Sequence, residues 1–97
     1  MIGNMDEICA NAVKKWGVYS QLMVVIEELS ELQKAVCNFY RGREHNIPEE
    51  IADVRIMLRQ LELICNCEDQ ADRQINNKLC RLRERLDLPE KKGGVYD

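Results

Sequence analysis

The sequence predicts an all-α fold, and three observations lead to it. Apolar residues recur at three- and four-residue spacings along most of the chain, whereas no segment alternates as a half-buried strand does. Only two prolines and five glycines interrupt the 97 residues, so a few long elements are expected. A domain of this size has a small core, and many such chains gain stability by associating. We therefore expect one domain, residues 1–97, whose four helices join an oligomeric helix bundle.

The first two helices are expected from their ends and from their apolar residues. A helix over about 6–16 can be capped by Asn4 or Asp6, and Gly17 can end it in a left-handed turn. A longer helix over about 20–40 follows from apolar residues at helical spacing: Leu22, Val25, Ile26, Leu29, Leu32 and Val36.

The third and fourth helices are expected over about 47–65 and 69–86. Pro48 suits the first turn of the third helix. Its apolar residues are Ile51, Val54, Met57, Leu58, Leu61 and Ile64. Those of the fourth helix are Ala71, Ile75, Leu79, Leu82 and Leu86. Pro89 ends that helix, and the polar, glycine-containing segment 88–97 is expected to be a mobile tail.

Charge and cysteine content argue against several classes of protein. The net charge of −3, from 14 basic and 17 acidic residues, disfavours a nucleic acid polymer as partner. No apolar run is long enough for a membrane span and no secretory leader is recognisable, so we expect no membrane partner and a cytoplasmic location. Five cysteines, an odd count, do not suit a disulfide framework and are expected to be reduced packing residues.

Two acidic patterns are the strongest indication of function. Carboxylates three residues apart lie on one face of a helix, so Glu28 with Glu31, and Glu50 with Asp53, form two claws of oxygen ligands. Both claws adjoin apolar stripes, where four carboxylates are unfavourable unless a cation compensates for repulsion and desolvation. Mg²⁺ prefers oxygen ligands and suits a site without histidine or cysteine, with Mn²⁺ as the alternative. The sequence therefore predicts a divalent metal site.

Either acidic pattern alone has a simpler explanation. Acidic runs on helices usually lie on a solvated face, where they pair with basic residues such as Lys34 and Arg55. Two patterns on consecutive helices, both against apolar stripes, favour the metal site instead. A di-iron or di-manganese centre is disfavoured, because such bundles normally supply Glu-x-x-His pairs and the chain has only His45.

These residues resemble the MazG-like nucleoside triphosphate pyrophosphohydrolases, whose signature is Glu-Glu-x-x-Glu on one helix followed by Glu-x-x-Asp on the next. The two patterns here are Glu27-Glu28-Leu29-Ser30-Glu31 and Glu50-Ile51-Ala52-Asp53. Weaker similarities are Lys15-Trp16-Gly17, Gln21-Leu22, Glu49 before Glu50, and Asn76-Asn77-Lys78-Leu79 before Arg81. The resemblance spans most of the chain.

The resemblance implies the all-α NTP pyrophosphatase fold, assembled as a homodimer or homotetramer. It also implies Mg²⁺-dependent cleavage between the α- and β-phosphates of a nucleoside triphosphate, which gives a monophosphate and pyrophosphate. The implied metal ligands are Glu28, Glu31, Glu50 and Asp53, while Glu27 would orient the attacking water or assist another ion. Short proteins with this motif pair usually resemble house-cleaning enzymes for standard or damaged deoxynucleotides. A relative acting on phosphoribosyl-ATP is the alternative.

Residues outside the acidic patterns are expected to hold the rest of the substrate. Lys78 and Arg81 can offset triphosphate charge, from the same chain or a neighbouring one, or can simply solvate their helix. Trp16 can stack on a base, although such a residue more often anchors a helix end in the core. Gln21 and Asn76 can hydrogen-bond a base or sugar. The non-enzymatic alternative is a helical oligomer that binds another protein through its amphipathic faces.

Overall fold

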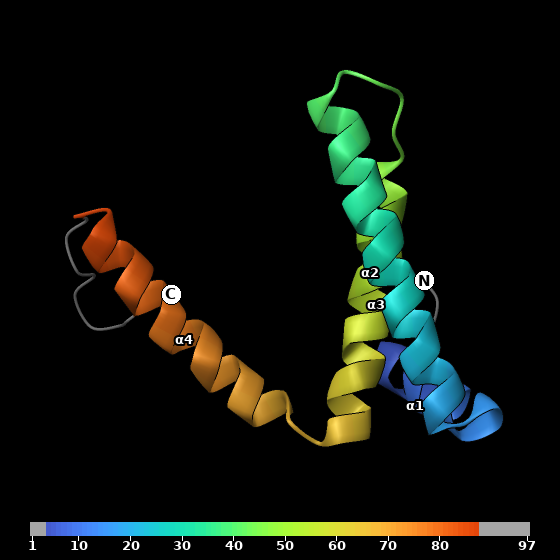
Figure 1. The fold of residues 1–97 in the computed structure, drawn as a ribbon. Helices are drawn as coiled ribbons and strands as arrows, with labels where there is room; N and C mark the ends of the chain where they lie inside the picture. The colour runs from blue at the N-terminus through green and yellow to red at the C-terminus, as the bar shows by residue number, and fades with distance from the viewer. Residues whose placement is uncertain (1–3, 88–97) are drawn as a thin grey trace. The chain divides into compact units, whose positions relative to one another are not determined.

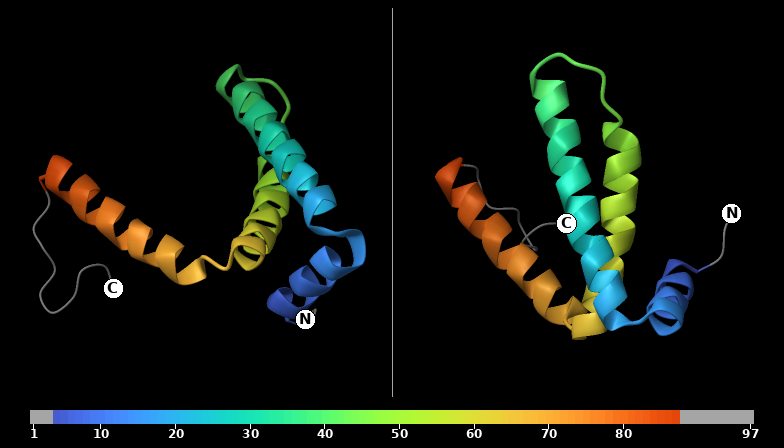
Figure 2. Two further views of the ribbon diagram at one scale, coloured as in Figure 1. Left: turned by 60° about the horizontal axis from the view of Figure 1, so that its bottom comes forward. Right: turned by 45° about the vertical axis from the view of Figure 1, so that its right-hand side comes forward.

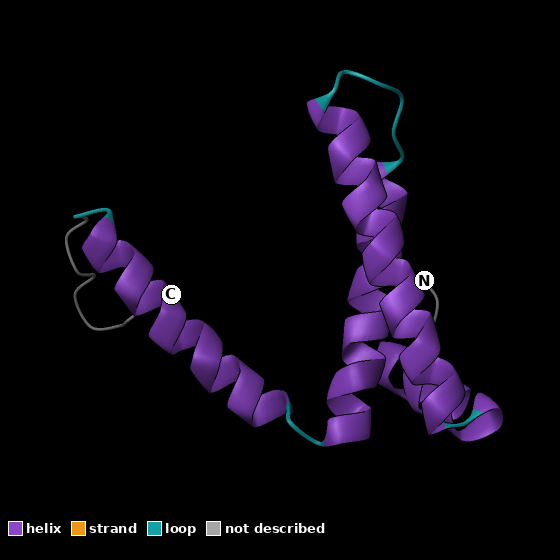
Figure 3. Ribbon diagram, viewed as in Figure 1, coloured by secondary structure: helices purple, strands orange, loops and turns teal. Residues whose placement is uncertain are grey.

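The computed structural model describes residues 4–87, which form helices joined by short turns (Figure 1, Figure 3). The helices are Met5–Trp16 (α1), Val18–Tyr40 (α2), Ile47–Cys65 (α3) and Glu68–Arg85 (α4), and this part of the chain has no strand. The predicted all-α fold with four helices is thereby confirmed. None of the described helices is long and apolar enough to cross a membrane. The expected mobile tail, 88–97, lies outside the described residues.

Local signals in the sequence define the ends of α1. The side-chain oxygen of Asn4 accepts a hydrogen bond of 2.8 Å from the backbone N–H of Asp6 and so caps the first turn. Gly17 separates α1 from α2 with a φ of +93°, which a residue without Cβ adopts at little cost. A single glycine is enough for this break, so α2 begins at Val18, two residues before the predicted start.

The chain divides into two compact units, and the first, which ends at Asn66, is built on an antiparallel hairpin of α2 and α3. The two helices lie side by side in each view (Figure 1, Figure 2). Their seam buries Val25 and Ala35 of α2 against Val54 and Met57 of α3. These residues recur at helical spacing on both helices, as expected for helices that pack on one another.

The short helix α1 packs against the hairpin through one thiol and one ion pair. Cys9 is 1% exposed, and its Sγ lies 3.8 Å from the carbonyl oxygen of Ile56. The guanidinium of Arg59 donates to both carboxylate oxygens of Asp6, at 2.6 and 3.0 Å. All five cysteines are free, so the expected packing role holds for Cys9 but is wrong for Cys37 and Cys65, which are exposed.

The second unit begins at Cys67 and contains α4. This helix carries the predicted apolar stripe, yet none of its residues is buried. The large apolar side chains of the stripe are 36–59% exposed, and they are Ile75, Leu79, Leu82 and Leu86. The stripe on α4 is therefore an open apolar surface.

Candidate metal centre

Three of the four predicted ligands converge in the seam between α2 and α3. Glu28 on α2 and Glu50 and Asp53 on α3 each offer one carboxylate oxygen, and these oxygens lie within 4.8 Å of one another. Glu50 and Asp53 share a face of α3 because three residues separate them. The spacing of the acids and the antiparallel packing of the helices together produce the cluster.

The surroundings of the cluster disfavour negative charge. Glu50 is only 7% exposed, while Glu28 and Asp53 are half-buried. Burial raises the pKa of Glu28, and a hydrogen bond that its carboxyl donates to Asp53 and the charges of Asp53, Glu50 and Glu31 raise it further. Burial likewise raises the pKa of Glu50, and the hydrogen bond to Asp53, the charge of Asp53 and the charge of Glu31 add to the rise. A hydrogen bond with Asn46 lowers the pKa by a smaller amount. Negative charge on Glu28 and Glu50 is therefore costly, and a bound cation would offset that cost.

The donor set fits a hard divalent cation. Glu28, Glu50 and Asp53 supply three carboxylates with no nitrogen or sulfur among them, which suits Mg²⁺ or Mn²⁺. Magnesium–oxygen distances of about 2.1 Å place two opposite ligands about 4.2 Å apart. Only one pair of three ligands can be opposite, and neighbouring ligands lie about 3.0 Å apart, so oxygens up to 4.8 Å apart would need to approach by as much as about 1.8 Å through side-chain rotation. Such an ion keeps positions for water and phosphate oxygens.

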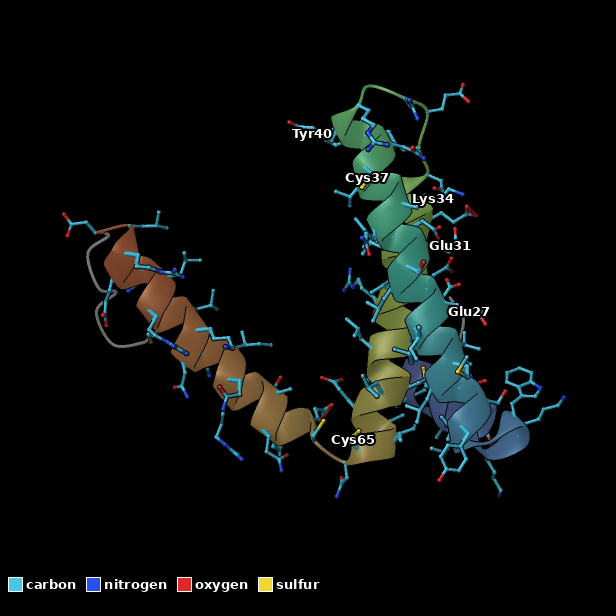
Figure 4. All side chains as sticks on the ribbon, viewed as in Figure 1. Glu27, Glu31, Lys34, Cys37, Tyr40 and Cys65 are labelled. Carbon is cyan, nitrogen blue, oxygen red and sulfur yellow. The ribbon has the colours of Figure 1, made fainter. Side chains whose placement is uncertain are left out.

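The other two acids of the first pattern lie outside the cluster. Glu31 is exposed, but its charge still contributes to the raised pKa values of Glu28 and Glu50. Figure 4 shows Glu27, which is also exposed, on the same side of α2 as Glu31. The structure therefore brings Glu28, Glu50 and Asp53 together and leaves the exposed Glu27 and Glu31 outside the cluster.

A buried amide pair occupies the same seam. The Nε2 of Gln21 donates to the Oε1 of Gln60 at 2.7 Å, and both residues are 5% exposed. Gln21 precedes Glu28 by two helical turns and Gln60 follows Asp53 by two turns, so the pair lies about 10 Å along the seam from the acids. Gln60 was not among the predicted residues. The sequence signal that could have identified Gln60 was its position in the apolar stripe of α3.

The remaining predicted site residues are exposed. Trp16 is 59% exposed, with the Nζ of Lys15 5.7 Å from its ring centroid, so it does not anchor a helix end in the core. Asn76, Lys78 and Arg81 belong to the second unit. Lys78 and Arg81 line a pocket on α4 together with Glu84 and Arg85.

Comparison with known proteins adds no relative. The sequence matches no protein family, and neither a curated protein nor a solved structure matches it significantly. The resemblance carried by the two acidic patterns accordingly stays a prediction. The chemistry of the site is argued from its own residues.

Proposed function

We propose that the chain is a Mg²⁺-dependent nucleoside triphosphate pyrophosphohydrolase that cleaves between the α- and β-phosphates. One observation carries the proposal: Glu28, Glu50 and Asp53 place three oxygens within 4.8 Å of one another, in a seam that disfavours their charge. A bound cation offsets that cost and offers its free positions to phosphate oxygens. The two acidic patterns support this class of reaction, with deoxynucleotides as the expected substrates.

The carboxylates divide into two groups with different roles. Glu28, Glu50 and Asp53 would hold the ion, and the resemblance implies Glu31 as a fourth ligand. The bound ion supplies charge neutralisation at the phosphates and lowers the pKa of water. Glu27 is exposed on α2, and the resemblance implies that its carboxylate would orient the attacking water or assist another ion. No covalent nucleophile is required.

Groups outside the cluster bind the rest of the substrate. Lys78 and Arg81 are exposed cations on α4, and the resemblance implies that such groups, from the same chain or a neighbouring one, would offset the charge of the outer phosphates. Trp16 presents an exposed ring that suits stacking on a base. Asn76 supplies an exposed amide for the base or sugar, whereas the amide of Gln21 is buried and bonded to Gln60.

The test is a panel of nucleoside triphosphates with and without Mg²⁺, scored for both monophosphate and pyrophosphate. Glu50→Gln removes a ligand at constant size and is expected to lower the rate by roughly 10³-fold, because a metal contributes several kcal/mol to such reactions. Glu44→Gln is the matched control, since it makes the same change at an exposed residue six positions earlier. Its rate should stay within about twofold of wild type.

Two outcomes would contradict the proposal. One is the absence of pyrophosphate from every triphosphate at high protein concentration, and the other is retained turnover in Glu50→Gln. Melting with Mg²⁺ separates binding from chemistry, because the wild-type protein should melt higher and Glu50→Gln should not. The non-enzymatic alternative predicts no Mg²⁺ effect in either.

A further inference from the structure

A pocket on the first unit gathers positive charge that the acidic cluster does not use. It encloses about 460 Å³ against the second half of α2, and among the described residues its lining contains three cations, Lys34, Arg41 and Arg43, and no acid. Figure 4 shows Lys34 and Cys37, which both line the pocket, near the end of α2. A chain with a net charge of −3 thus has one pocket lined by cations alone among its charged residues.

Helical spacing and one tight turn bring the lining residues together. Four of them recur in steps of four and three along the chain and therefore share one face of α2. They are Ser30, Lys34, Cys37 and Arg41. Gly42 then adopts a φ of +71°, which a residue without Cβ tolerates. The backbone N–H of Arg43 donates to the carbonyl oxygen of Asn38 at 2.8 Å, so the chain turns back over the end of the helix and adds a third cation.

No carboxylate neutralises these cations. Within residues 4–87, none of the three forms an ion pair. Glu31 lies three residues before Lys34, a spacing that permits pairing, yet the two do not pair. The carbonyl end of α2 favours cations, but a helix terminus carries only about half an elementary charge. Most of the positive charge is therefore free to attract an anion.

We propose that this pocket binds a phosphate group. A phosphate monoester carries a charge of about −1.5 to −2 at neutral pH, which matches three cations better than a single carboxylate does. The guanidinium groups of Arg41 and Arg43 present paired N–H donors that fit phosphate oxygens, and Lys34 adds a compact charge. Ser30 and Asn38 line the same pocket and supply neutral donors.

The pocket is separate from the acidic cluster. Lys34, Cys37 and Arg41 follow Glu28 by six, nine and thirteen residues, which turns them about 120–180° away from it around α2. The helical rise also places them roughly 9–20 Å further along the helix. A phosphate in the pocket is therefore not one that a metal at the cluster would hold, and both sites can be occupied together.

The exposed thiol of Cys37 provides the test, because a phosphate held by the neighbouring cations would cover it. Iodoacetamide alkylates the full-length chain at constant pH, with a chelator and without Mg²⁺, and mass spectrometry quantifies each cysteine. Inorganic phosphate or pyrophosphate should slow the reaction of Cys37 by at least about threefold once most sites are filled. Sodium chloride of equal ionic strength should not. Cys65 is the internal control, since it is exposed and lies outside the pocket.

A matched pair of variants tests whether the cations of the pocket hold the anion. Arg41→Gln removes one of them and should raise the phosphate concentration for half-protection of Cys37 by about tenfold, because charge-assisted hydrogen bonds are the strong ones. Arg55→Gln makes the same change at an exposed residue of α3 outside the pocket, and it should shift that concentration less than about twofold. Both variants should keep the helicity of wild type.

Vesicles that contain phosphatidic acid, used in place of the free anions, distinguish the source of the phosphate. Protection of Cys37 by the free anions assigns the pocket to a small phosphorylated molecule, and protection by the vesicles alone assigns it to a lipid headgroup. Protection by neither would overturn the proposal. Equal slowing of Cys37 and Cys65, or equal weakening by Arg41→Gln and Arg55→Gln, would overturn it too. The chelator makes every outcome independent of metal binding at the acidic cluster, so failure here leaves the proposed hydrolase untouched.

Discussion

The α2–α3 hairpin and α4 carry similar apolar periodicity but use it differently. The hairpin buries Val25 and Ala35 against Val54 and Met57, whereas no residue of α4 is buried. An apolar stripe at helical spacing therefore establishes which face of a helix is apolar, but not what covers it. Most of the stability of a helix comes from the packing of that face rather than from its intrinsic propensity.

The two regions also differ in how they treat polar groups. The hairpin seam encloses Glu50 and the Gln21–Gln60 pair, which must be satisfied inside the protein. The basic residues Lys78 and Arg81 of α4 are exposed. Mutations in the seam should therefore change stability, whereas exposed changes on α4 should not.

The largest expected contrast is between a seam residue and a residue of the α4 stripe. Met57→Ala removes a buried side chain and should lower the free energy of unfolding by about 2–5 kcal/mol. Leu82→Ala acts on a residue that is 42% exposed and should cost less than about 1 kcal/mol. Urea unfolding followed by helicity measures both. Equal losses would show that the α4 stripe is buried in the protein in solution, and the contrast would fail.

A smaller effect is expected at the amide pair. Gln21→Leu leaves the Gln60 amide without its partner in a buried site and should cost about 1–3 kcal/mol. The double variant Gln21→Leu/Gln60→Leu removes both partners, so it should cost less than the sum of the single changes. Gln74→Leu on α4 is the exposed control and should stay within about 0.5 kcal/mol of wild type. Additive single changes would mean that the hydrogen bond contributes nothing.

Helical spacing was sufficient to predict the four helices and the face on which Glu50 and Asp53 lie together. It also placed Glu28 beside the apolar stripe of α2. These expectations needed only the fixed rotation per residue. The same rule predicts the stripe of α4.

The details of the site depend on side-chain rotamers and on how the helices pack, and helical spacing alone does not determine these. Whether Glu31 joins Glu28 depends on side-chain rotamers and on the rotation of α2 against α3, and the structure leaves Glu31 outside the cluster. The partner of Gln21 depends on the register of the hairpin, which pairs it with Gln60. The exposure of Trp16 depends on how α1 packs, which a single helix pattern does not determine.

The smallest expected effect is a pH dependence that belongs to the hairpin alone. The pKa values of Glu28 and Glu50 are raised above their usual 4.5 by burial and by Asp53, so the folded state binds more protons than the unfolded state just above pH 4.5. Their contribution to stability should therefore fall as the pH rises from 4.5 through the raised values in metal-free buffer. Asp6 acts in the opposite direction and at lower pH. The Arg59 hydrogen bond lowers the pKa of Asp6 below 3.8, so the contribution of this carboxylate to stability is lost only as the pH falls through that lowered value. Urea unfolding between pH 4.5 and 7 with a chelator should show a smaller decline for Glu50→Gln than for wild type, whereas Glu84→Gln on α4 should leave the decline unchanged. A decline that persists in full in Glu50→Gln would assign the titration to groups outside the acidic cluster.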